Sequence, residues 1–199
     1  MEHYNLAFSG LGGQGVMTVS QVLATAAAHE NVQVMVFEGT GISQRGGGVF
    51  SFVRFGESYS PKIPIGGADA LISLEISEII RIIQYLKPQG QIWVNSGKIH
   101  GYYTKLRPEL YPMEDKIREM IRLKTNHLSM IPARRLAQEA GSAQAINMTM
   151  LGAFSSVNSI LNMDSIIWAI EESSKKFAEV NLKAFWIGYN FAKNEEMTE

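Results

Sequence analysis

The sequence predicts a three-layer α/β domain with a Rossmann-like, mostly parallel sheet and a helical C-terminal region. Strand patterns alternate with helical patterns over the first two-thirds of the chain, which is typical of a parallel sheet covered by helices. A glycine-rich turn joins the first strand to the first helix, and the last third reads as helix throughout. With 199 residues, of which 46% are hydrophobic, the chain can bury one sizeable core. We therefore expect a single domain over residues 1–199.

The first elements follow from apolar runs separated by glycines. YNLAF opens a buried strand over residues 4–9, and residues 15–29 carry apolar side chains at helical spacing. A second strand is expected over 32–38. The stretch GTGISQRGGG, residues 39–48, is too rich in glycine for a helix or strand interior. The strand expected over 49–55 follows this loop rather than a helix, so it can run antiparallel to its neighbours.

The remaining elements complete the alternating pattern. ADALISLE predicts a strand over 68–75, followed by a helix over 76–86 that turns Ile79, Ile80, Ile83 and Leu86 inward. GQIWVN predicts a strand over 90–95, and HLSMI a last strand after a long connection. Further helices are expected over residues 113–124, 132–140, 146–160, 164–177 and 179–192.

Composition narrows the class of function. The net charge is −1, so no basic footprint indicates nucleic acid or an anionic membrane surface as a partner. No apolar run approaches the roughly 20 residues of a membrane span, and the start MEHYNLAF does not resemble a signal peptide, so we expect a cytoplasmic protein. Cysteine is absent, which excludes thiolate-held iron–sulfur clusters on this chain. The four histidines show no metal-ligand spacing, and we expect no metal site.

The first glycine-rich loop, GLGGQG, fits the G-x-G-x-x-G fingerprint through Gly10, Gly12 and Gly15. Such a loop lets a phosphate approach the backbone at a helix start. Glu38 ends the next strand, where a dinucleotide-binding protein carries its ribose-binding carboxylate. Two interpretations stay open at this point: a dinucleotide site, or a tight turn that binds nothing. Gly13 and Gln14 sharpen the pattern without naming a ligand.

A second glycine-rich loop places Ser43, Gln44 and Arg45 between glycines. A guanidinium such as that of Arg45 can make a two-pronged contact with phosphate or carboxylate. The glycines Gly46, Gly47 and Gly48 allow main-chain N–H groups to line an anion cradle. Equally, the arginine can simply tie down its own loop through backbone carbonyls.

Taken together, GLGGQGV, then EGTGISQRGG, then SPKIPIGGADALISLE resemble the gamma module of 2-oxoacid:ferredoxin oxidoreductases. The same module occurs as the beta subunit of indolepyruvate:ferredoxin oxidoreductase. The resemblance continues more faintly through INMTMLGAF and NLKAFWIGY, so it spans almost the whole chain. It implies one subunit of a complex that converts a 2-oxoacid and coenzyme A to acyl-CoA and carbon dioxide while reducing ferredoxin.

The resemblance also implies partners and a site. Thiamine diphosphate and the clusters are expected on partner subunits, since this chain has neither cysteine nor the G-D-G signature of thiamine enzymes. No catalytic residue is expected here; the module is associated with binding coenzyme A. The residues matching the two family loops, and so expected to contact the cofactor, are Gly10, Gly12, Gly13, Gln14, Gly15, Glu38, Ser43, Gln44, Arg45, Gly46 and Gly47.

Three readings therefore remain for function. The leading one is the coenzyme A-binding and assembly subunit of such a complex, of indolepyruvate or another aryl 2-oxoacid type, inactive when isolated. The others are a free-standing NAD-binding oxidoreductase and a purely structural subunit. Asp69 and Glu75 flank a predicted strand, where we expect caps rather than an acid/base pair. An aromatic stripe near the C-terminus is expected to serve either as core or as subunit interface: Leu182, Phe185, Trp186 and Tyr189.

Overall fold

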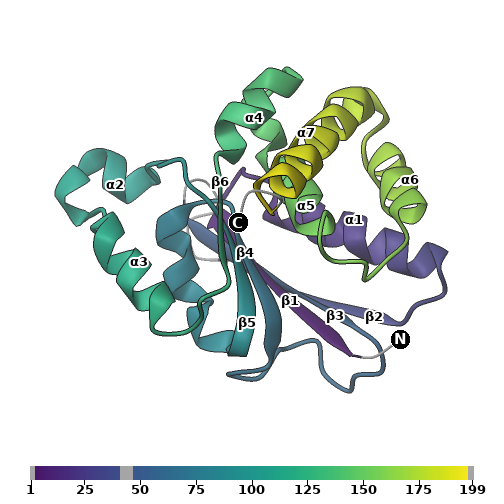
Figure 1. The fold of residues 1–199 in the computed structure, drawn as a ribbon, viewed down its shortest axis with the longest axis horizontal. Helices are drawn as coiled ribbons and strands as arrows, with labels where there is room; N and C mark the ends of the chain where they lie inside the picture. Colours follow the sequence, from purple (N-terminus) through teal and green to yellow (C-terminus); the bar gives the residue numbers. More distant parts are fainter. Residues whose placement is uncertain (1–2, 41–46, 197–199) are drawn as a thin grey trace.

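A computed structural model describes residues 3–40 and 47–196, in which a six-stranded sheet lies between two helical layers (Figure 1). The strands are β1 (Tyr4–Leu11), β2 (Val34–Thr40), β3 (Gly48–Phe55), β4 (Ala68–Ser73), β5 (Leu86–Asn95) and β6 (Leu128–Ile131). The α-helices are α1 (Val16–His29), α2 (Tyr102–Leu106), α3 (Glu114–Arg122), α4 (Ala133–Ala140), α5 (Ile146–Ser155), α6 (Met163–Ser173) and α7 (Ala178–Glu196). Short 3-10 helices are η1 (Ile76–Arg81), η2 (Ile83–Tyr85), η3 (Pro108–Leu110), η4 (Ala143–Ala145) and η5 (Lys175–Phe177).

The sheet has the strand order β2-β3-β1-β4-β5-β6. Strands β1, β4, β5 and β6 pair in parallel, whereas β3 lies antiparallel to both β1 and β2. The predicted fold class is therefore confirmed, and so is the antiparallel strand. The chain enters β3 from the second glycine loop without a crossover helix, and such a connection suits an antiparallel neighbour.

Two apolar cores fill the two faces of the sheet. On one face, α1 and α4–α7 cover inward side chains such as Leu6, Phe8 and Ile72. On the other face, η1, η2 and α3 cover the alternate set, which includes Leu71 and Ile92. Alternation along each strand sends neighbouring residues to opposite faces, and both faces are covered, so the strands read as nearly continuous apolar runs.

The helix predicted over residues 76–86 is wrong in type and extent. The segment forms two short 3-10 helices, and Leu86 already belongs to β5. Ile80, expected to face inward, is 42% exposed. A 3-10 turn advances farther per residue than an α-helix, and the β-branched isoleucines lower the helix propensity, so the short connection between two parallel strands is bridged without a full helix.

The C-terminal helices pack unusually closely where α5 crosses α7. A Cβ atom on Gly152 would lie 1.9 Å from the carbonyl oxygen of Phe185, and one on Gly188 would lie 2.0 Å from that of Thr149. Both glycines therefore let the two backbones touch. The predicted aromatic stripe on α7 is divided between core and surface. Phe185 is fully buried, whereas Trp186 is 38% exposed.

Candidate functional site

The first glycine loop joins the end of β1 to the start of α1. Gly13 and Gly15 have φ angles of 95° and 82°, in the left-handed region that glycine adopts without strain. Gly15 is the N-cap of α1, and no side chain caps the helix. The first N–H groups of α1 therefore have no intrahelical acceptor, and they carry the positive end of the helix dipole.

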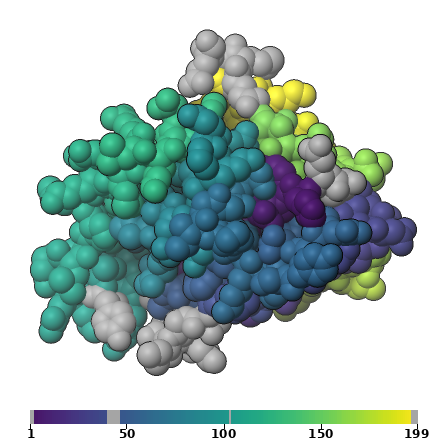
Figure 2. Space-filling view, turned by 90° about the horizontal axis from the view of Figure 1, so that it is seen from below, coloured from purple at the N-terminus to yellow at the C-terminus, as the bar shows by residue number. Residues whose placement is uncertain are grey.

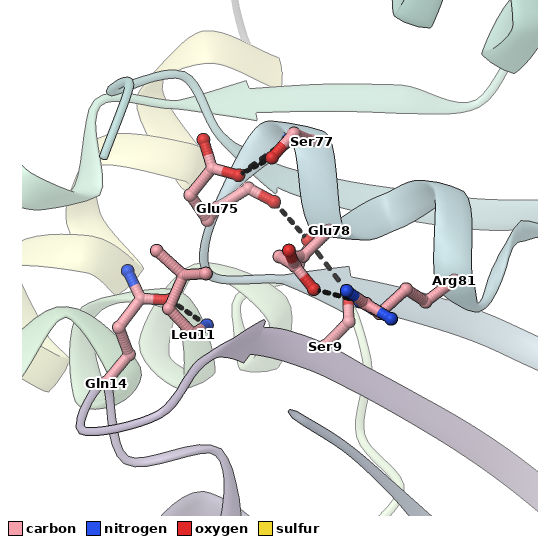
Figure 3. Close-up of polar contacts among 8 residues, drawn as sticks. Ser9, Leu11, Gln14, Glu75, Ser77, Glu78 and Arg81 are labelled. Atoms are coloured by element: carbon pink, nitrogen blue, oxygen red, sulfur yellow. Dashed lines mark hydrogen bonds and ion pairs between the residues drawn. The ribbon is translucent and has the colours of Figure 1, made fainter. Parts of the chain in front are cut away.

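Gln14 closes the loop from within. Its side-chain oxygen accepts from the N–H of Leu11 at 2.6 Å (Figure 3). Its amide nitrogen donates to the carbonyl of Leu74 at 3.3 Å. The side chain thus ties the ends of β1 and β4 together. Gly10 leaves room for this brace, since a Cβ there would lie 2.8 Å from the Gln14 oxygen. In this arrangement the amide of Gln14 serves the loop itself.

The two glycine loops meet. The N–H of Gly12 donates to the carbonyl of Gly47 at 2.9 Å. The neighbouring Gly48 lies against the ion pair of Glu78 and Arg81 on η1, because a Cβ on Gly48 would come within 2.2 Å of both side chains. Burial raises the pKa of the Glu78 carboxyl, and Arg81 opposes that shift. The end of the second loop therefore lies between the first loop and η1. Figure 3 shows the Glu78–Arg81 pair of η1.

Four of the predicted contact residues lie outside the described part of the chain: Ser43, Gln44, Arg45 and Gly46. Their expected contact with an anion stays a prediction. The described chain resumes at Gly47, whose carbonyl accepts from the N–H of Gly12.

Glu38 does not lie beside the first glycine loop. It pairs with Ser51 of β3, which in turn pairs with Phe8 of β1, so one whole strand separates Glu38 from β1. Adjacent strands are about 4.8 Å apart, which puts the Glu38 backbone roughly 10 Å from β1. In a dinucleotide-binding fold the second strand neighbours the first. In this strand order Glu38 lies one strand farther from the first loop than the carboxylate of a dinucleotide-binding fold does, and its expected contact with a cofactor stays a prediction.

Two carboxylates, Asp69 within β4 and Glu75 two residues after it, bind groups within the protein. Asp69 accepts from the N–H of Asn5 at 2.7 Å and pairs with Lys87. Glu75 is fully buried, accepts from the N–H of Ser77 at 2.8 Å as the cap of η1, and also accepts from the Tyr111 hydroxyl. Burial, and then the bond to Glu75, raise the pKa of the Tyr111 phenol. The expectation of caps holds for Glu75, whereas Asp69 anchors strand ends.

Two cavities flank the first loop at the carboxyl ends of the strands. The larger, of about 480 Å³, lies between the start of α1, the α4–α5 connection and the α6–α7 connection. Hydroxyl and amide side chains line it, among them Thr18, Gln21, Thr25, Gln144, Asn147 and Asn181. The smaller, of about 200 Å³, is a crevice bounded by Gly13, Gln14, Ile99, Arg134 and residues 143–146. Ligands of open α/β sheets bind at this edge, where the strand order reverses between β1 and β4.

Two residues of this site were missed by the sequence-based prediction. Asn147, on α5, donates to the carbonyl of Gly15 at 3.3 Å, and a Cβ on Gly15 would lie 2.4 Å from its amide nitrogen. Arg134, near the start of α4, lines the smaller crevice. Both stand far from the glycine loops in sequence. Asn147 lies within the INMTMLGAF stretch, which was the one signal pointing to it.

Fold and site define a doubly wound α/β domain with a braced glycine loop at the switch point of its sheet. Residues 5–191 match the family described as pyruvate ferredoxin/flavodoxin oxidoreductase, and the chain belongs to that family. It is a gamma-type module of the 2-oxoacid:ferredoxin oxidoreductases, as the resemblance of the glycine motifs implies.

Curated relatives match this chain over nearly its whole length. The chain is 34% identical to indolepyruvate oxidoreductase subunit IorB of Thermococcus kodakarensis over 97% of this chain and 98% of the relative. It is 35% identical to the IorB subunit of Archaeoglobus fulgidus over 94% of each. A pyruvate/ketoisovalerate oxidoreductase common subunit gamma, from Pyrococcus abyssi, is 28% identical over 90% of this chain and 91% of the relative. The indolepyruvate type is thus the better match.

Solved structures share the fold. Pyruvate oxidoreductase subunit PORC of Thermotoga maritima superposes with a TM-score of 0.71 at 22% identity, covering 96% of this chain and 97% of that one. A 2-oxoglutarate:ferredoxin oxidoreductase from Magnetococcus marinus, described with 2-oxoglutarate, coenzyme A and succinyl-CoA bound, gives a TM-score of 0.73 at 19% identity. There the match covers 98% of this chain but 32% of the longer one.

Proposed function

We propose that this chain is the subunit of an indolepyruvate-type 2-oxoacid:ferredoxin oxidoreductase that contributes coenzyme A binding and assembly. The observation that carries the coenzyme A role is the junction of the two glycine loops between two cavities at the switch point of the sheet. A ligand that carries phosphates suits backbone N–H groups at a helix start, and hydroxyl and amide side chains suit its polar arms. The Magnetococcus marinus enzyme with coenzyme A bound supports the assignment by analogy of fold.

Thiamine diphosphate and iron–sulfur clusters belong to partner subunits in this proposal. The residues of this chain do not suit an iron–sulfur cluster, because the chain has no cysteine to supply thiolate ligands. Among the described residues, no three histidine or carboxylate side chains come together as a metal site. In this proposal the oxidative decarboxylation and the transfer of electrons to ferredoxin occur on the partner subunit, and the isolated chain is inactive.

The substrate assignment follows the relatives. The proteins named indolepyruvate oxidoreductase match at 30–35% identity, and those named for pyruvate at 25–28%. We assign the aryl 2-oxoacid to the complex rather than to a pocket of this chain. The proposal includes a cytoplasmic location for the complex and its ferredoxin. No helix in the described ranges is long and apolar enough to cross a membrane.

An assembly role needs an exposed apolar surface, and residues 102–113 supply one. Tyr102, Leu106, Leu110 and Met113 are each more than half exposed. A hollow of about 450 Å³ lies beside Leu110 and Met113, with Ile80 of η1 in its wall. This segment, green-teal in Figure 2, forms one flank of the molecule, whereas α6 lies at the opposite flank. Exposed apolar clusters of this kind mark contact surfaces. On α7, Trp186 is the exposed member of the aromatic stripe.

The test of the proposed function is reconstitution. We expect the chain to co-purify with the thiamine- and cluster-bearing subunit, and the complex to oxidise indolepyruvate only when coenzyme A is present. The isolated chain, shown to be free of both cofactors, should give no turnover with any electron acceptor. Leu110→Asp with Met113→Asp should weaken co-purification, while Tyr59→Asp, at a fully exposed position outside residues 102–113, should not. Two well-folded chains that do not associate would contradict the assembly role.

Titration with coenzyme A and with NAD distinguishes the proposed function from that of a free-standing NAD-binding oxidoreductase. Coenzyme A should bind the complex and NAD should not, because Glu38 lies one strand away from β1. Saturable NAD binding in the absence of coenzyme A binding would favour the free-standing oxidoreductase. If neither coenzyme A nor NAD binds and the complex assembles normally, the purely structural subunit is the interpretation that remains.

A further inference from the structure

The crevice beside the first glycine loop contains one charged side chain among its described lining residues. Arg134 bounds it together with Gly13, Gln14 and Ile99, and none of the lining residues is acidic. A Cβ on Gly97, which follows β5, would lie 3.6 Å from the Cβ of Arg134. The stem of the arginine is thus placed at the carboxyl ends of β5 and β6, at the same edge as the glycine loop.

The guanidinium of Arg134 is available to a ligand. No carboxylate in residues 3–40 or 47–196 forms an ion pair with it, whereas the next residue, Arg135, is paired with Glu139 one turn along α4. Both arginines are exposed residues of α4, but only Arg134 is among the residues that line the crevice. An unpaired guanidinium that bounds a crevice is suited to a two-pronged contact with an anion.

The opposite wall of the crevice is open backbone. A Cβ on Gly13 would meet no atom within 4 Å, so the space over this residue is empty. Gly13 and Gln144 line both the crevice and the larger cavity, and they form the ridge between them. A ligand that occupies both hollows must therefore cross Gly13, and its polar arm would lie among the hydroxyl and amide groups of the larger cavity.

We propose that Arg134 binds the diphosphate of an adenine-nucleotide ligand in this crevice, against the backbone of Gly13. The inference rests on the proposed coenzyme A function and names the residue and hollow that hold its diphosphate. A diphosphate is an anion that can pair with the guanidinium, and a long ligand can reach both hollows, which share Gly13 and Gln144 in their linings. A small 2-oxoacid would fill the crevice alone and leave the larger cavity unused.

The experiment measures dissociation constants by calorimetry on the full chain and on its complex, with coenzyme A, ADP, pantetheine and indolepyruvate as probes. The variants are Arg134→Ala, Arg134→Gln and Arg134→Lys, with Arg135→Ala as the matched control. Losing a charge-assisted contact should weaken binding of coenzyme A and ADP about tenfold or more. Arg134→Lys should restore part of the affinity, since an ammonium lacks the planar fork. Pantetheine binding should not change in any variant, and Arg135→Ala should bind like wild type.

Several outcomes would overturn the inference. If Arg134→Ala and Arg134→Gln bind coenzyme A as tightly as wild type does, Arg134 is not part of the site. The coenzyme A function itself would then stand. Equal weakening of pantetheine and coenzyme A would show a role unrelated to the diphosphate. Weakening of indolepyruvate alone would make the crevice a 2-oxoacid site. A wild-type complex that binds ADP but not coenzyme A would keep the diphosphate site and remove the proposed function.

Discussion

The backbone N–H of Gly12 donates to the carbonyl oxygen of Gly47, so the first glycine-rich loop holds the end of the second. The bond joins the carboxyl end of β1 to the start of β3, its antiparallel neighbour. Within the first loop, Gln14 donates to the carbonyl of Leu74, just after β4, and Asn147 of α5 donates to the carbonyl of Gly15. The loops are consequently parts of one assembly, and substitutions at their glycines should report on its packing.

Gly15→Ala should destabilise the protein more than Gly13→Ala. Both residues have positive φ, which costs an alanine about 1–2 kcal/mol. The added Cβ meets open space at Gly13 but lies 2.4 Å from the Asn147 amide at Gly15, so the hydrogen bond of that amide is lost as well, worth about 1 kcal/mol. Denaturant unfolding of the two variants measures the difference. Equal losses would mean that Asn147 moves aside without cost.

Gly48→Ala should cost about 1–2 kcal/mol of folding free energy, because its Cβ meets the Glu78–Arg81 pair. Neighbouring residues are not additive, so the loss should shrink in an Arg81→Ala background. A double-mutant cycle on the free energy of unfolding tests this coupling. An unchanged loss without Arg81 would place the conflict elsewhere in the loop.

Gly152→Ala should destabilise by about 2 kcal/mol or more, although alanine is intrinsically the better helix former by about 1 kcal/mol. Its Cβ would lie 1.9 Å from a backbone oxygen of α7, which cannot turn away as a side chain can. Ala153→Gly, one residue along the same helix, is the comparison variant, which loses helix propensity together with one buried methyl group. Thermal unfolding of the two variants should separate the contact from the propensity. An increase in stability for Gly152→Ala would refute the close crossing of α5 and α7.

Glu114→Gln should show a pH-dependent loss of stability. Hydrogen bonds from Arg118 and Lys98 hold the pKa of the Glu114 carboxyl below its ordinary value. The stabilisation is therefore present above the unfolded-state pKa, and it disappears as the pH falls through the lower folded-state pKa. Because these pairs are partly exposed, the loss at pH 7 should be about 0.5–1 kcal/mol. Unfolding of wild type and variant from pH 7 to pH 3 should give converging curves; a constant gap would point to a non-ionic cause.

Much of the fold followed from local pattern. The apolar runs identified the strands from β1 to β6, and the glycine loop before residues 49–55 indicated the antiparallel strand. The α-helix predicted over residues 76–86 was wrong. The apolar spacing of this segment is compatible with an α-helix, but the short link between two parallel strands favours 3-10 turns. Helix ends such as Ser155 and Ser173 fell a few residues earlier than predicted, as expected where no strong stop residue marks the end.

The sequence by itself determined the family, the layered fold and the absence of thiolate chemistry, because motifs, periodicity and composition are local properties of the chain. Only the tertiary structure decided which groups meet. It inserted β3 between β1 and β2 and so moved Glu38 away from the loop, whereas a sequence count of about 20 residues had brought them together. It also placed Arg134 and Asn147 at the loop from more than a hundred residues away. Strand order and helix packing are long-range relations, set by which apolar faces cover one another, and no local pattern encodes them.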